Sequence, residues 1–568
     1  MVSLVPPSIR EFMNLPWSQI EPYYRQLLER PLDQAQVAAW LEDWSQLARL
    51  LNETSNRLYV ATTVNTEDEV AERRYQEFLD EIYPSAQAWD QQLKEKLIAS
   101  GLQPTGFEVP LRNMRAEVDL FEQSNLPLLA EELKLGLRYA KVVGAQTVEW
   151  EGEERTISQL RPVQQDFDRE RRERAWRLAS SRQLADRQVL NALWQQLLPL
   201  RQRIAENAGK KDYRDYQWQR LLRFAYSPQD CLRFHDAIEQ VVVPAARRVY
   251  EKRQHQLGVP SLRPWDLEVD PLRRPPLRPF LSVDQLKETT SRIFNRLDQQ
   301  FGKYFDTMRQ EGLLDLENRK AKAPGGYCTD FYASRRPFIF MNAVGLHDDV
   351  QTLLHESGHA FHFFESSRLP YYQQMQIGSE IAEVASMGME LLASPYLTED
   401  KGGFYDPTQA ARARIEHLEG VLLFWPYMAV VDAFQHWVYE HPGLAIEPDN
   451  CDATWSKLWD RFMVGVDWSG LEEEKVTGWQ RKLHIFEVPF YYVEYGLAQL
   501  GAVQVWRNAL QDQAQAVEAY RQALALGGTR PLPDLYAAAG ARFAMDADTL
   551  RQAVDLLEQN IHKLEAVG

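Results

Sequence analysis

The chain has 568 residues, of which 45% are hydrophobic and 11% aromatic, so it is long enough for two substantial domains and is not a disordered protein. Its net charge of -17 and the lack of a long basic run argue against nucleic acid as a partner, because phosphate binding requires a basic face. The cysteines, Cys231, Cys328 and Cys451, are odd in number and far apart, which excludes a disulfide framework and a Cys-x-x-Cys metal site and fits a reducing cytoplasm.

The sequence has neither a predicted signal peptide nor a predicted membrane-spanning segment. Residues 1–7 lack the basic start and sustained apolar run of a signal peptide. The longest apolar stretch, 421–431, contains Pro426 and is too short to cross a bilayer. We therefore predict a soluble, cytoplasmic protein without a membrane partner.

The first part of the chain reads as helix after helix. From about residue 20 to residue 222, Leu, Ala, Gln, Arg and Glu recur at amphipathic spacing. The pattern breaks at Pro84, at 101–104 and at 125–127. A helical N-terminal region is therefore expected.

The middle of the chain is less regular. Residues 257–281 are rich in proline and cannot form a regular helix, so we expect a long excursion there. Helical patterns resume over 282–314 and from about 410 to 568. Only 326–344 has the alternation of β-strands, with a turn at 334–337. The fold should be mainly α with one small β-sheet.

A His-Glu-Ser-Gly-His sequence begins at His355, directly after the predicted strands. Apolar spacing predicts an amphipathic helix over 349–365, which puts His355 and His359 at positions i and i+4 on one face. Two imidazoles so arranged can bind one zinc ion, with Glu356 beside the open position of the metal. Two core histidines bonded to backbone are the alternative reading. His362 is expected to pack or to hydrogen bond behind the ligands.

A second helix is predicted after Gly378, and its acids share one stripe of an otherwise apolar surface, which favours a bound cation. Glu383 lies far enough after His359 for the chain to turn and bring this helix alongside the first. We predict Glu383 as the third ligand, with Glu380 and Glu390 as alternatives. Glu380 or Glu390 could otherwise orient a ligand histidine. A His, His, Glu set leaves one tetrahedral position to water, as in catalytic zinc sites.

The strand that precedes the metal helix is a candidate substrate-binding edge. Residues 337–343 could pair with an extended peptide by β-augmentation, although a hairpin in the core would have the same pattern. The nearby glycines could let backbone approach a ligand or could only form a turn. The expected substrate contacts in this part of the chain are Gly325, Gly326, Phe340, Met341, Asn342 and Ala343.

Further motifs extend over roughly residues 200–568. They are His-Glu-Ser-Gly-His-Ala-Phe-His at 355–362, Glu-Ile-Ala-Glu-Val-Ala-Ser at 380–386, Lys-Ala-Pro-Gly-Gly-Tyr-Cys at 322–328, Asp-Tyr-Arg-Asp-Tyr at 212–216, His-Ile-Phe-Glu-Val-Pro-Phe-Tyr-Tyr-Val-Glu-Tyr at 484–495, and Gly527-Gly528. Together they resemble oligoendopeptidase F-type enzymes, within the thimet oligopeptidase superfamily of zinc metallopeptidases. The N-terminal third matches only in its helical character.

The resemblance implies a zincin-like catalytic core and two helical lobes around a deep substrate channel. It implies one Zn²⁺ per chain, held by His355, His359 and Glu383, with Glu356 as the catalytic base. We therefore take 1–190 as an N-terminal helical region, and the remainder is expected to be the zinc metallopeptidase catalytic region, 191–568.

The resemblance also implies that a histidine and tyrosines near the C-terminus lie over the substrate carbonyl. The best matches are His484, Tyr492 and Tyr495. Tyr491 competes with Tyr492 for the same role, because the spacing from the histidine to the tyrosines differs by about one residue from that expected of the thimet branch. If Tyr492 has that role, Tyr491 is expected to be a substrate contact. Tyrosines packed in the core are the alternative reading.

The expected reaction is endopeptidase cleavage of short to medium oligopeptides by metal-activated water, with Glu356 moving the proton. A helical zinc carboxypeptidase would also carry His-Glu-x-Gly-His, but it would have a second His-Glu pair on the next helix, which 380–386 lacks. A non-catalytic peptide- or metal-binding protein is the other alternative, and it would have little use for Glu356. No pattern specifies an oligomeric state.

Overall fold

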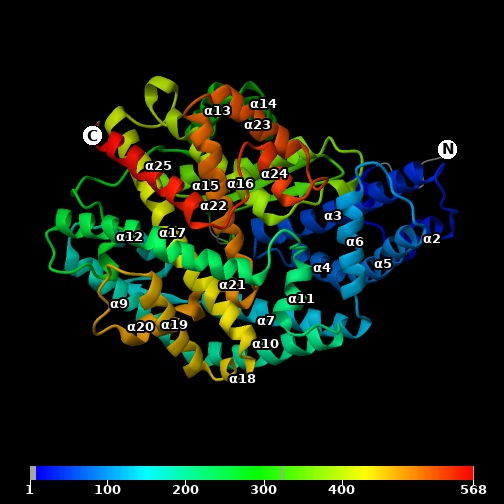
Figure 1. The fold of residues 1–568 in the computed structure, drawn as a ribbon, viewed down its shortest axis with the longest axis horizontal. Helices are drawn as coiled ribbons and strands as arrows, with labels where there is room; N and C mark the ends of the chain where they lie inside the picture. The colour runs from blue at the N-terminus through cyan, green and yellow to red at the C-terminus, as the bar shows by residue number, and fades with distance from the viewer. Residues whose placement is uncertain (1–7, 320, 324, 567–568) are drawn as a thin grey trace.

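The computed structural model describes residues 8–566 except 320 and 324, so the predicted absence of a signal sequence at 1–7 lies outside the described residues. The fold is mainly α with small β-sheets, as predicted (Figure 1). No helix in the described part of the chain combines the length and hydropathy that a membrane span requires. The described cysteines form no disulfide bond.

The first helices enclose a hydrophobic core of their own, which includes Trp40, Trp44 and Leu47. The break predicted at Pro84 is a change of helix type and not a loop. The chain passes through a π-helical turn, Phe78–Ile82, and Pro84 lies in the first helical turn after it, where a missing N–H does no harm. The helices of this part, blue in Figure 1, are α1 (Ile9–Phe12), α2 (Trp17–Glu29), α3 (Val37–Val64), α4 (Glu69–Glu77), α5 (Tyr83–Ala99) and α6 (Glu108–Leu120).

A second and larger hydrophobic core is shared by most of the remaining helices. The domain boundary at residue 190 stays a prediction. Up to the proline-rich stretch the helices are α7 (Leu126–Gly144), α8 (Arg161–Gln164), α9 (Arg169–Ala185), α10 (Arg187–Asn207), α11 (Tyr213–Arg220) and α12 (Pro228–Leu257). Beyond it they are α13 (Val283–Leu297), α14 (Gln299–Gln310), α15 (His347–Ser366), α16 (Ser379–Ala393), α17 (Pro407–Glu440), α18 (Pro442–Ala445), α19 (Pro448–Phe462), α20 (Glu472–Val476), α21 (Leu483–Phe486), α22 (Tyr492–Ala509), α23 (Gln513–Ala525), α24 (Leu532–Ala538) and α25 (Ala547–Glu565).

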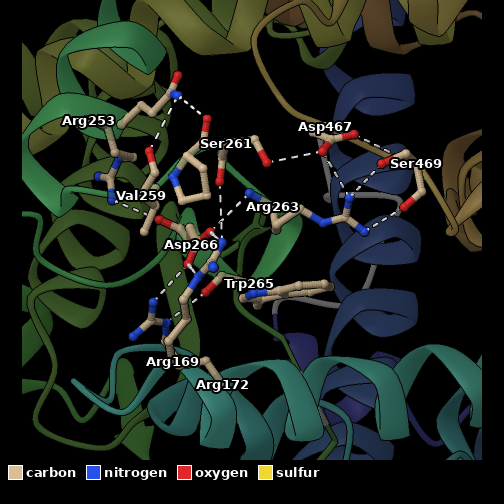
Figure 2. A network of polar contacts seen from close by, with 12 residues as sticks. Arg169, Arg172, Arg253, Val259, Ser261, Arg263, Trp265, Asp266, Asp467 and Ser469 are labelled. Carbon is tan, nitrogen blue, oxygen red and sulfur yellow. Dashed lines mark hydrogen bonds and ion pairs between the residues drawn. The ribbon is translucent and has the colours of Figure 1, made fainter.

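The proline-rich stretch 257–281 has no α-helix beyond the end of α12, and a buried carboxylate anchors it to α9. The side chain of Asp266 accepts hydrogen bonds from Arg169 Nη2 at 2.7 Å and Arg172 Nη2 at 2.8 Å, as Figure 2 shows. Arg169 Nε and the backbone N–H of Arg263 also donate to it, each at 3.0 Å. Burial opposes ionisation of Asp266, but these bonds outweigh it and hold its pKa below the usual value. The irregular segment therefore has a defined position.

The β-structure exceeds the single region predicted from sequence. Strands β1 (Thr147–Trp150) and β2 (Glu153–Thr156) form an antiparallel hairpin outside that region. Its two turn residues, Glu151 and Gly152, have φ of 54° and 85°, the left-handed backbone that a tight hairpin requires. This hairpin could not be recognised from the sequence, because the residues on both sides of it have the periodic pattern of helices.

The three-stranded sheet beside the site has the order β3 (Leu314–Glu317), β5 (Arg336–Ala343), β4 (Tyr327–Phe331). Ile339 of β5 pairs with Leu314 in parallel register and with Cys328 in antiparallel register. β5 is thus the central strand, and the prediction that 337–343 is a free edge is wrong. The strand at the edge nearest the metal helix is β4.

Candidate metal centre and active site

Helices α15 and α16 bring the three predicted ligands together. His355 and His359 come from α15 and Glu383 from α16, both predicted as helices. The two helices cross closely at Gly358, where a Cβ atom would lie 2.5 Å from the carbonyl oxygen of Ala385. A glycine is therefore required between the two histidines for the third ligand to reach them.

The distances between the ligand atoms suit a single metal ion. The Nε2 atoms of His355 and His359 lie 3.4 Å and 3.7 Å from Oε2 of Glu383. One donor atom from each of the three residues lies within 4.8 Å of the others. Tetrahedral zinc with bonds of about 2.1 Å places its ligand atoms roughly 3.4 Å apart, so two imidazoles and a carboxylate here fit zinc.

The charges of the site also favour a cation. Burial opposes ionisation of Glu383, but His359, His355 and the hydroxyl of Ser386 at 2.8 Å outweigh it and lower the pKa of Glu383 to about 2. Burial lowers the pKa of His359 to about 4, which leaves a neutral ring with a free lone pair. Burial opposes a proton on His355, yet its bonds to Glu383 and Glu390 raise its pKa well above the usual value. A metal ion would take the place of that proton.

Glu390 orients the first ligand histidine. Its Oε1 lies 2.6 Å from Nδ1 of His355, so Nε2 of that ring faces the other ligands. Its Oε2 pairs with Nε2 of His417 on α17 at 2.8 Å. Glu380, the other acid predicted for this role, instead accepts a hydrogen bond from the hydroxyl of Tyr226 at 2.8 Å, and its carboxylate is not bonded to a ligand histidine. His417 could not be identified from the sequence, because only tertiary packing brings α17 beside Glu390.

We expect Glu390→Gln to weaken zinc binding about 10- to 100-fold while the fold is retained. The carboxylate of Glu390 is a charged hydrogen-bond acceptor for Nδ1 of His355, and the uncharged amide of glutamine would orient this ring less strongly. Competition with a fluorescent chelator measures the affinity. Glu380→Gln on the same helix is the matched control and should bind zinc as the unchanged protein does. Equal affinities for all three proteins would remove Glu390 from the metal site.

Glu356 stands on the wall of the cavity that holds the ligands. The cavity has a volume of about 410 Å³, and His355, His359 and Glu383 also line it. Burial raises the pKa of Glu356 to about 7. Among the described residues no side chain donates a hydrogen bond to its carboxylate, and the backbone N–H of Cys328 does donate one. Glu356 is therefore placed to accept a proton beside the metal, whose charge would favour its ionised form.

Of the tyrosines predicted near the C-terminus, Tyr491 and Tyr495 line this cavity. The hydroxyl of Tyr491 donates a hydrogen bond to Oε1 of Glu383 at 3.0 Å. Tyr492, predicted as catalytic, does not line the cavity, and its hydroxyl accepts a hydrogen bond from Nζ of Lys482 at 2.9 Å. The geometry therefore favours Tyr491 with Tyr495 over the predicted pair of Tyr492 with Tyr495.

Two further histidines, His484 and His362, lie near the cavity. The ring of His484 lies 4.9 Å from that of Tyr492 and 5.9 Å from that of Tyr495, beside the cavity wall. His362 lines the cavity and is not in the ligand group. Burial lowers the pKa of each histidine to about 3, so both rings are neutral.

The predicted contacts on β5 do not reach the cavity. Phe340, Met341 and Ala343 are buried in the hydrophobic core, and their strand is paired on both sides. Asn342 instead holds the glycine turn, because its amide donates to the carbonyl oxygen of Gly325 at 3.0 Å. These residues shape the turn and sheet, and they are absent from the described lining of the cavity, so the structure gives no support to their predicted role as substrate contacts.

The edge strand β4 takes the place predicted for β5. Gly326, just before it, lines the cavity together with Tyr327, Cys328 and Asp330. Gly326 was among the predicted contacts, whereas the three β4 residues Tyr327, Cys328 and Asp330 were not. Their position on the first strand of the same predicted hairpin could have indicated them. An extended peptide would meet β4 first.

Another buried group of possible ligands, between α12 and α17, forms a hydrogen-bonded network. Donor atoms of Cys231, Asp432 and His436 lie within 4.8 Å of one another. His235 Nε2 lies 2.8 Å from Oδ2 of Asp432, and Nη1 of Arg214 lies 3.3 Å from Nδ1 of His436. Burial raises the pKa of Cys231 well above its usual value, which disfavours the thiolate that a metal requires. The network therefore serves helix packing.

Comparisons with known proteins agree with this geometry. The model of Peptidase family M3 matches residues 163–555, and that of the Peptidase M3 N-terminal domain matches 11–105. The sequence motifs described above did not extend into residues 11–105. "Oligopeptidase PepF" of Bacillus subtilis is 22% identical over 270 residues, 46% of this chain and 39% of the relative. "Oligoendopeptidase F, chromosomal" of Lactococcus lactis subsp. cremoris is 23% identical over 257 residues, 45% of this chain and 41% of the relative.

The alignments to these curated relatives thus span about two fifths of the relatives' length. Similarity to a solved structure extends further. PZ peptidase A, in a structure with an inhibitor, has a TM-score of 0.89 at 26% identity, over 98% of this chain and 100% of that chain.

Proposed function

Because the chain belongs to peptidase family M3, with the features of its oligoendopeptidase F-type members, we propose that it is a zinc-dependent endopeptidase that hydrolyses short to medium oligopeptides. The observation that carries the proposal is the meeting of His355, His359 and Glu383 beside Glu356 in one cavity. A single Zn²⁺ held by the three ligands would supply Lewis-acid chemistry and lower the pKa of a water molecule.

The side chains of this chain would carry out the proton transfers. Glu356 accepts a proton from the attacking water and then donates it to the nitrogen of the leaving amine. Tyr495 donates a hydrogen bond to the carbonyl oxygen as it gains negative charge, and Tyr491 does so once its hydroxyl turns from Glu383 to the substrate. Burial raises the pKa of Tyr491 and of Tyr495 above the usual value, so both hydroxyls keep their protons at neutral pH.

A peptide would bind in extended form along β4. Edge strands offer unpaired backbone groups, and β4 lies at the end of its sheet beside the metal helix. Backbone pairing supports cleavage inside a chain, because it needs no free terminus. Mass spectrometry of the products of a quenched ten-residue peptide tests this proposal. Cleavage at an internal bond, blocked by a chelator, is expected; sequential loss of C-terminal residues would favour the carboxypeptidase alternative.

We expect Tyr495→Phe to lower kcat about 10²- to 10³-fold with a smaller change in KM, because the lost hydroxyl acts on the developing charge. Tyr491→Phe should behave similarly, with zinc content measured because Tyr491 also contacts Glu383. Tyr492→Phe is the matched control, since its hydroxyl is bonded to Lys482 outside the cavity. If Tyr492→Phe lost as much kcat as the other two, the choice of Tyr491 would be wrong.

Substrates should be limited by their folded state. The imidazoles of His355 and His359 are only 24% and 23% exposed and lie in a cavity walled largely by helices, so a folded surface loop cannot reach them without local unfolding. A small disulfide-bonded protein should resist cleavage, and the same protein reduced and alkylated should be cut. Gel electrophoresis of timed samples measures the cleavage rate of each form. Similar rates for the two forms would show that the metal lies in an open cleft.

A further inference from the structure

The cavity beside the ligands contains an acid that the proposed mechanism does not use. Asp330 lies two positions after Cys328 on β4, so both side chains are on the same face of the strand. Both residues line the cavity together with Glu356 and His362. Asp330 therefore faces the space into which a substrate side chain would extend.

Apart from the histidines, no cationic side chain in the described lining of the cavity is available to this acid. Lys and Arg are absent from the described lining of the cavity, which includes the acids Glu356, Glu383 and Asp330. Bound zinc would be partnered by Glu383, and Glu356 serves as the base. Burial raises the pKa of Asp330 to about 7, although a hydrogen bond from the hydroxyl of Tyr332 acts in the opposite direction. A cation brought by the substrate would stabilise the ionised carboxylate.

The space around Asp330 suits a long side chain with a charged end. Tyr332 is hydrogen-bonded to both Asp330 and Gln376, and its ring packs against Phe363 with centroids 5.2 Å apart. Phe363 and Ile377 add apolar surface to the same cavity. An aliphatic stem can lie along such walls while its charged head reaches the carboxylate.

The position of Asp330 is held from the N-terminal helices. The amide of Asn56 on α3 donates to the backbone carbonyl oxygen of Asp330 at 2.8 Å. Glu53, one turn earlier, accepts a hydrogen bond from the backbone N–H of Ser334 at 2.7 Å. The end of β4 is thus anchored to α3, which holds Asp330 in a fixed position in the cavity wall.

We propose that Asp330 selects oligopeptides with lysine or arginine next to the cleaved bond, a specificity that rests on the proposed peptidase function. The basic head forms a charge-assisted hydrogen bond with the carboxylate in a partly water-excluded cavity. Such a bond is expected to raise kcat/KM about 10- to 100-fold over glutamine, which has similar length and no charge.

The test is a set of quenched peptides that differ at a single position, with Lys, Arg, Gln, Leu or Glu placed in turn at each of the two positions on either side of the cleaved bond. Mass spectrometry confirms that the bond cut stays the same. The unchanged protein should prefer Lys or Arg at one of these positions, and Asp330→Asn should lose that preference while the Gln peptide changes less than about threefold. Asp330→Glu should retain a preference for the basic peptides.

Asp548→Asn is the matched control, because Asp548 is 86% exposed on α25, outside the cavity. Zinc content and circular dichroism establish that Asp330→Asn is folded and loaded. Equal cleavage of all peptides by the unchanged protein, or a basic preference that survives in Asp330→Asn, would overturn the assignment of Asp330. Failure to cleave any peptide would count against the proposed function itself.

Discussion

Glu356→Gln is expected to lower kcat about 10²- to 10⁴-fold while zinc and the fold are retained, because the amide has nearly the same shape but cannot accept a proton. Glu356 is 7% exposed and lines the ligand cavity without belonging to the ligand group, so the change leaves the metal centre intact. Stopped assays with a quenched peptide measure kcat, and metal analysis of the same sample measures zinc.

Asp348→Asn is the matched control for this substitution. Asp348 is on the same helix with a side chain 62% exposed, paired with Arg161. It should keep nearly normal turnover. If metal-loaded Glu356→Gln cleaved peptides at a rate close to that of Asp348→Asn, Glu356 would have no part in the mechanism.

His359→Ala should lose both the zinc and the peptidase activity. The alanine removes one of three protein ligands, and the remaining imidazole and carboxylate hold the ion far more weakly. Metal analysis after dialysis should find close to one zinc per chain in the unchanged protein and almost none in the variant.

His362→Gln is the control, because His362 lies one helical turn further along α15, lines the same cavity and is outside the ligand group. It should keep its zinc. Full zinc in His359→Ala, or loss of zinc from His362→Gln alone, would mean that the ion is held by a different set of residues.

The meeting of the three proposed ligands could be predicted because their geometry is local. The i, i+4 spacing of His355 and His359 belongs to any helix, and Glu383 follows a short connection to the next one. The small residue between the histidines, Gly358, is part of the same motif and permits the helices to cross. Only the backbone of a helix pair was needed to bring these side chains together.

The strand edge could not be predicted, because it depends on a pairing that the hairpin does not contain. β3 adds to β5 in parallel across the intervening chain, with Leu314 opposite Ile339, and leaves β4 as the edge. Apolar alternation in 337–343 fits a central strand and an edge strand equally.

The choice between neighbouring tyrosines depended on one backbone angle. Phe490 has φ of 67°, a left-handed conformation that a bulky residue rarely adopts, and α22 begins after it. Tyr491 and Tyr495, four positions apart, then share the cavity face, while Tyr492 is rotated by about 100° around the helix axis. The sequence contains no sign of this turn, so it left the choice between Tyr491 and Tyr492 open.

The most direct measurement is a zinc titration of the metal-free chain with peptide cleavage as the readout. Chelated protein should be inactive, and activity should rise linearly with added Zn²⁺ and level off at one equivalent per chain, whereas His359→Ala should gain little at the same concentrations. Cleavage by metal-free protein at the full rate, or full recovery of His359→Ala with one equivalent, would contradict a catalytic zinc held by His355, His359 and Glu383.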